Sequence, residues 1–137
     1  MKRIYMTVIF CFFTGICFSD SDYRITIDPM YLIDGSQILA GESIEHVVDL
    51  DIKKPIGFSS LQVEISGSGT ARIYHESSND GYDYNTVSGY SDIVTSLTAG
   101  SEIYQFGLPF ARFLKIIFAE TGGVNPIIVE SATLAIQ

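Results

Sequence analysis

The chain has 137 residues, of which 47% are hydrophobic and 18% charged, a composition typical of one globular domain and unlike a disordered or collagen-like chain. Eight basic and sixteen acidic residues give a formal net charge of −8, which argues against nucleic-acid binding and against a polybasic membrane-surface protein. The sequence therefore predicts a single acidic domain whose partners are not nucleic acids.

The N-terminal nineteen residues have the features of a secretory signal peptide. Two basic residues precede an almost continuous apolar run, Ile4 to Phe18, and the chain turns polar and acidic from Ser19 onward. This order is typical of a signal that is cleaved, and the run is shorter than the roughly 20 residues of a membrane-spanning helix. We expect cleavage after Ser19, which leaves residues 20–137 as the mature domain. An uncleaved N-terminal anchor and a lipid anchor on Cys17 are the alternatives.

Both cysteines, Cys11 and Cys17, lie within this segment. The mature protein would therefore be secreted, periplasmic or on the cell surface without a disulfide, and a packed core alone would have to hold it together. We expect no membrane insertion once the signal is removed.

Short segments rich in β-branched and aromatic residues alternate with turn signals along the rest of the chain. This spacing favours strands, and no window of eleven residues shows a helical apolar stripe. The pattern predicts an all-β, jelly-roll-like antiparallel β-sandwich of about eight strands in a single domain. In chain order the expected strands are Tyr23–Ile27, Met30–Ile33, Ile44–Ile52, Leu61–Ile65, Thr70–Glu76, Glu102–Phe106, Arg112–Phe118 and Ile127–Ile136.

Three of these strands carry more specific expectations. Leu61–Ile65 and Thr70–Glu76 flank a Gly-Ser-Gly sequence, so we expect them to form a β-hairpin. Arg112–Phe118 is apolar on both faces, which is typical of a central strand that is covered on both sides.

Residues suited to catalysis are scarce. His46 and His75 each fall on the apolar face of an expected strand and form no metal-binding motif, so we interpret them as core residues. The mature chain has no cysteine nucleophile and no G-x-S-x-G elbow, and carboxylate spacing alone cannot identify a glycosidase pair. We expect no catalytic residues, no metal site and no cofactor.

One polar loop concentrates carboxylates, amides and three tyrosines between two expected strands. Its tyrosine rings could stack on the apolar faces of a sugar while Asn and Asp accept hydrogen bonds from hydroxyl groups. Its oxygen atoms could instead bind calcium, although the spacing is not that of an EF-hand. A solvated turn with positive φ at Asp80-Gly81 is the third interpretation. The candidate ligand-binding residues are Asn79, Asp80, Tyr82, Asp83, Tyr84 and Tyr90.

From His46 onward the order of short motifs resembles the discoidin-like domain, the coagulation factor type C module of the galactose-binding-like class. The motifs are a D-L pair at Asp49-Leu50, an S-x-D-G-x-x-aromatic segment at Ser78–Tyr84, and an A-R-aromatic-hydrophobic-[RK]-I segment at Ala111–Ile116. The usual tryptophans and the end-to-end cysteine pair of that family are absent. The same features are also similar to small β-sandwich proteins of virions and bacterial surface assemblies. The resemblance implies a jelly roll that adheres to surfaces, often to glycans or lipid headgroups, without enzymatic activity.

These observations favour a secreted, non-catalytic β-sandwich that acts by surface contact. It would be an adhesion or glycan-binding module, or an extracellular assembly subunit whose mature N-terminal strand, residues 23–27, adds to the sheet edge of a cell-surface or identical protein. The alternatives are a small secreted hydrolase with a carboxylate pair and a calcium-stabilised structural module.

Overall fold

The computed structural model describes residues 29–50, 58–86, 92–108 and 111–136. The expected signal peptide, the expected strand 23–27 and Tyr90 lie outside these ranges. The described residues form strands and no helix, and none of them could cross the membrane as a long apolar helix. The all-β expectation is confirmed by eight strands: β1 (Met30–Ile38), β2 (Ser43–Asp49), β3 (Phe58–Gly67), β4 (Ala71–Ser78), β5 (Asp92–Leu97), β6 (Gly100–Gly107), β7 (Phe113–Glu120) and β8 (Ile127–Ile136).

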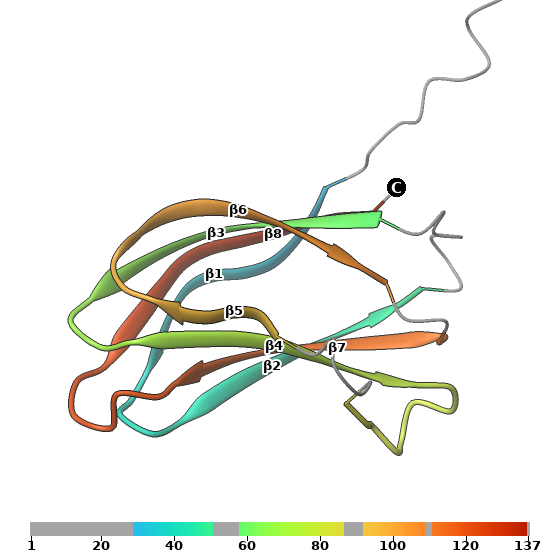
Figure 1. The fold of residues 1–137 in the computed structure, drawn as a ribbon, viewed down its shortest axis with the longest axis horizontal. Helices are drawn as coiled ribbons and strands as arrows, with labels where there is room; N and C mark the ends of the chain where they lie inside the picture. The colour runs from blue at the N-terminus through green and yellow to red at the C-terminus, as the bar shows by residue number, and fades with distance from the viewer. Residues whose placement is uncertain (1–28, 51–57, 87–91, 109–110, 137) are drawn as a thin grey trace, which may run out of the picture.

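The strands form two four-stranded antiparallel sheets that face one another (Figure 1). Sheet A has the order β1-β8-β3-β6, and sheet B has the order β2-β7-β4-β5. Nearly every connection passes from one sheet to the other, and this double Greek-key order is that of a jelly roll. The single-domain β-sandwich that the sequence indicates is therefore correct at the level of topology as well as of class.

The core lies between the sheets because the strands alternate apolar and polar side chains. In β3, Leu61, Val63 and Ile65 are buried while the residues between them face solvent. In the opposite sheet, Ile116 and Phe118 of β7 are completely buried. Removing each such side chain from water contributes about 1.5–3 kcal/mol, and no disulfide is needed to explain the packing.

The expected hairpin between the third and fourth strands is wrong. β3 pairs with β6 and β8, whereas β4 pairs with β5 and β7. The short connection crosses from one sheet to the other instead of reversing within a sheet, so the two apolar faces meet across the core. Gly69 allows this crossing because a Cβ there would overlap the backbone oxygen of Asn125.

The central position expected for residues 112–118 is confirmed. β7 lies between β2 and β4, and Ile117 on its outer face is only 4% exposed. One strand was not predicted: β5 has only two buried side chains, Val94 and Leu97, and its pairing with β4 is irregular. Such an edge strand has no clear alternation for sequence reasoning to detect.

One buried carboxylate ties together three loops at one end of the sandwich. Glu120 is 3% exposed. Its Oε2 accepts the N–H groups of Gly41 at 2.8 Å and Gly123 at 2.9 Å, and its Oε1 accepts those of Gly122 at 2.6 Å and Thr70 at 3.3 Å. The Gly41 N–H, with the other three, lowers the pKa of Glu120 below its usual range although burial opposes the shift. Glu120 thereby joins the loops β1–β2, β3–β4 and β7–β8, which lie at one end of the sandwich (Figure 1).

Candidate functional site

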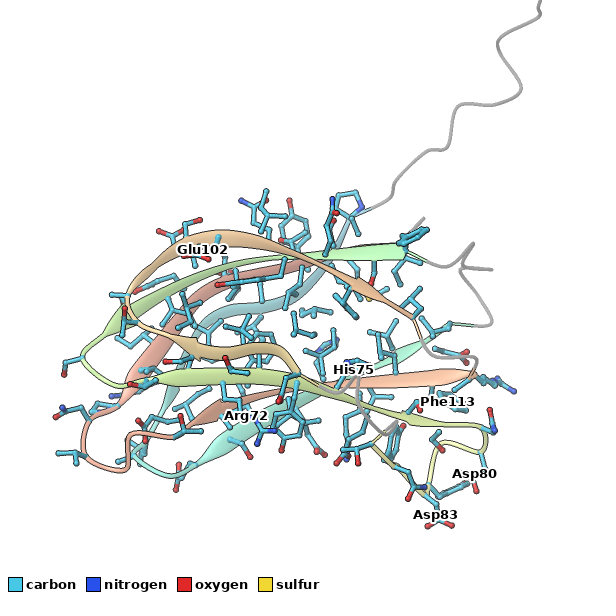
Figure 2. All side chains as sticks on the ribbon, in the orientation of Figure 1. Arg72, His75, Asp80, Asp83, Glu102 and Phe113 are labelled. Carbon is cyan, nitrogen blue, oxygen red and sulfur yellow. The ribbon has the colours of Figure 1, made fainter. Side chains whose placement is uncertain are left out.

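The polar loop that follows β4 is closed by a pair of backbone hydrogen bonds. The N–H of Ser77 donates to the carbonyl of Asn85 at 2.9 Å, and the N–H of Asn85 donates back at 3.0 Å. Residues 78–85, here called the 78–85 loop, therefore leave and rejoin the end of β4 as one compact unit. Figure 2 shows it at a corner of the sandwich, with Asp80 and Asp83 away from the core.

Two side chains organise the backbone within the loop. The Ser78 hydroxyl donates to Asp80 Oδ1 at 2.7 Å and accepts the Gly81 N–H at 2.9 Å. The same Asp80 oxygen accepts the N–H of Tyr82 at 2.9 Å and that of Asp83 at 3.1 Å. The Tyr82 N–H, the Ser78 hydroxyl and the Asp83 N–H together hold the pKa of Asp80 down at about 2. Asp80 therefore positions the loop from within.

The loop also rests on the ring of Phe113, the first residue of β7. Gly81 has a φ of 81°, a conformation that other residues adopt only at a cost. A Cβ at this position would lie 3.2–3.4 Å from three carbon atoms of the Phe113 ring. Glycine meets both requirements, whereas a residue with a Cβ would strain the backbone and require the ring to shift by a few tenths of an ångström.

A third anchor joins the loop to the outer face of sheet B. The ammonium group of Lys115 lies 4.5 Å from the centroid of the Tyr84 ring, a cation–π contact. The same group forms ion pairs with Glu76 at 2.7 Å and Glu45 at 3.5 Å. The bond to Glu76 is the main reason why the pKa of Lys115 is raised. Tyr84 is therefore turned toward the sheet and is only partly exposed.

The loop divides the candidate residues into two groups. Asp80 and Tyr84 are engaged in contacts within the protein, whereas Tyr82 is 88% exposed and Asn79 and Asp83 are also exposed. The sequence located the loop but did not separate these roles, because Lys115 and Phe113 belong to a distant strand. Within the described part of the chain, no group of three or more His, Cys, Asp or Glu side chains could hold a metal ion.

Both histidines lie on the core-facing side of their strands. His75 is 2% exposed, with its ring centroid 5.5 Å from that of Phe106. His46 pairs with the buried Ile116 and is partly exposed. The interpretation of the two as core-facing residues is confirmed.

No family model and no curated protein matches the chain. Solved structures that resemble it include the CBM22-1 xylan-binding domain of Paenibacillus barcinonensis Xyn10C, at 10% identity and a TM-score of 0.49 over 82% of this chain and 83% of that one. A CBM32 module produced by Clostridium perfringens is 16% identical, with a TM-score of 0.40 over 84% and 95% of the two chains.

A further similar structure is a family two carbohydrate esterase from Cellvibrio japonicus, at 10% identity and a TM-score of 0.41 over 80% of this chain. The chain spans only 31% of the length of that esterase. Two of these neighbours are named as carbohydrate-binding modules. All of these likenesses are distant, and the architecture described above rests on the strand order of this chain itself.

Proposed function

We propose that this protein is a secreted, non-catalytic module that binds glycans through the 78–85 loop. One observation carries the proposal: Tyr82 is 88% exposed at the tip of a loop whose backbone is fixed from within. An aromatic side chain normally reduces its exposure, so one held outward on an ordered loop is suited to contact with another molecule.

The loop offers both kinds of contact that sugar recognition requires. The Tyr82 ring can stack on the C–H face of a pyranose, and the exposed side chains of Asn79 and Asp83 can bond to its hydroxyl groups. Because Ser78 and Asp80 already order the backbone, binding loses little conformational entropy. The net charge of −8 favours an uncharged glycan over an anionic one.

The proposal is tested by a glycan array with the full chain, followed by titration with a soluble oligosaccharide from the array. Tyr82→Ala should weaken binding by about 1–3 kcal/mol, as for an aromatic residue at a binding hot spot, and Asp83→Ala should weaken it less. Val124→Ala is the control, because Val124 is 78% exposed but lies in the β7–β8 loop, away from both the 78–85 loop and sheet A's outer face. Failure to bind any glycan, or equal binding by Tyr82→Ala, would contradict the proposal.

Secretion is a separate part of the proposal and has its own test. The apolar segment before Ser19 supports it. N-terminal sequencing of protein recovered from the exported fraction should begin at Asp20. Recovery of the intact N-terminus from that fraction would contradict cleavage without affecting glycan binding.

A further inference from the structure

One half of the outer face of sheet A carries no charge. The strand register places Tyr31 opposite Thr133, Thr133 opposite Gln62, and Gln62 opposite Ile103, so these four side chains form one row across all four strands. The adjoining row consists of Ala135, Ser60 and Gln105. We call these seven residues, with Phe58 beyond them on β3, the neutral face.

The neutral face is also apolar at its margins. Tyr31 is 78% exposed on one edge strand, Ile103 is 66% exposed on the other, and Phe58 is 71% exposed at the start of β3. Each of these three side chains offers apolar surface that a partner on this face could cover.

Charge begins where the neutral face ends. The next row toward the other end of the sheet contains Asp34, opposite Ser131, and Glu64. Glu102, the neighbour of Ile103, pairs with the buried Val63 and therefore lies on the other side of its strand. Two copies of a chain with a net charge of −8 repel one another over most of their surface, and the neutral face is where this repulsion is least.

We propose that the neutral face binds a second copy of this chain, face to face, about a two-fold axis parallel to the strands. Such an axis reverses the order of the row in the second copy. Tyr31 of one copy then meets Ile103 of the other, and Thr133 meets Gln62. Apolar side chains thus meet apolar ones at both edges, and a hydroxyl meets an amide in the middle, so the row is complementary to itself.

The dimer leaves the 78–85 loop free on both copies. That loop is anchored to sheet B through the contacts of Lys115 and Phe113, whereas the copies meet through sheet A. Three strand spacings separate Tyr31 from Ile103, or about 14 Å, so the interface belongs to the small class below about 1,200 Å². We therefore expect association that is weak and depends on concentration.

Sedimentation velocity of the full chain from about 10 μM to 1 mM tests the proposal, since small interfaces have affinities in this range. The wild type should shift from monomer to dimer, and Ile103→Glu should raise the dissociation constant at least 10-fold. Val124→Glu is the matched control: Val124 is 78% exposed in the β7–β8 loop, so this variant has the same net charge and should dimerise like the wild type.

A charge exchange tests the pairing itself. Because Tyr31 meets Ile103 of the other copy, the double variant Tyr31→Lys/Ile103→Glu should dimerise again, with ion pairs at both edges. A wild type that remains monomeric at 1 mM would overturn the proposal, as would an Ile103→Glu variant that dimerises normally or a double variant that does not recover. A monomeric wild type whose glycan binding is lost in Ile103→Glu would assign the neutral face to the glycan instead. Since Tyr82 takes no part in the dimer, Tyr82→Ala should dimerise normally, and failure of glycan binding leaves this test intact.

Discussion

Replacing Gly81 by alanine tests whether the Phe113 ring fixes the 78–85 loop. The backbone cost is that of an L-residue at a φ of 81°, about 1 kcal/mol. The steric cost comes from a Cβ placed 3.2–3.4 Å from three ring atoms of Phe113, and we estimate it as about 1 kcal/mol, at the low end for overpacking because the site is partly exposed. Gly81→Ala should therefore lower the free energy of unfolding by about 2 kcal/mol.

Gly41 provides a matched control, since its φ is 76° and a Cβ there would meet no atom within 4 Å. Gly41→Ala should cost about 1 kcal/mol in urea denaturation, so the difference between the variants isolates the contact with the ring. Combining Gly81→Ala with Phe113→Leu should cost less than the sum of the single changes. The reasoning is refuted if Gly81→Ala costs no more than Gly41→Ala, or if the amide of Tyr82 exchanges hydrogen no faster in the variant.

Three further changes probe the other anchors. Glu120→Gln should lower the melting temperature by roughly 10 °C in calorimetry, because the amide nitrogen would face N–H donors that now bond to a carboxylate; an unchanged melting temperature would contradict the role of Glu120. Asp80 has a pKa lowered from 3.8 to about 2 in the folded protein, so its stabilisation is present above pH 4 and is lost as the pH falls toward 2. Asp80→Asn should reduce this acid-side loss of stability, and an identical pH profile would contradict the assignment. Lys115→Met should destabilise the protein by about 1 kcal/mol and increase the exposure of Tyr84 to fluorescence quenchers. Arg72→Met is its control, because Arg72 pairs with Asp92 and stacks on Tyr74 without contacting the loop; equal exposure of Tyr84 in both variants would argue against the anchor.

The strands could be predicted from sequence because their signal is local. Alternation in β2 and β3 places Val48, Leu61 and Val63 in the core without any knowledge of their partners. Strand pairing is not local, which is why the hairpin expected for β3 and β4 is wrong. Once the chain crosses between sheets, β3 meets β8, a strand that begins sixty residues after β3 ends.

The same holds for the candidate loop: its position could be predicted from local signals, but its contacts could not. The Asp-Gly turn and the clustered tyrosines located the loop, but which of its side chains are exposed depends on contacts with other elements. Tyr84 is turned inward by Lys115, and Glu120 bonds to Gly41 across 79 positions. No spacing rule connects residues that far apart, so a buried carboxylate of this kind becomes visible only in the folded structure.

The two ends of the sandwich differ in how they are held, and this difference bears on function. At one end, Glu120 joins three loops, so a change in any of them disturbs the others. At the opposite end, the 78–85 loop is held by its own Ser78 and Asp80 and by two residues of β7. None of these anchors involves the side chains of Tyr82 or Asp83, which can therefore be exchanged without loss of the loop conformation. A β-sandwich built in this way can alter what it contacts while its fold is maintained by the other end.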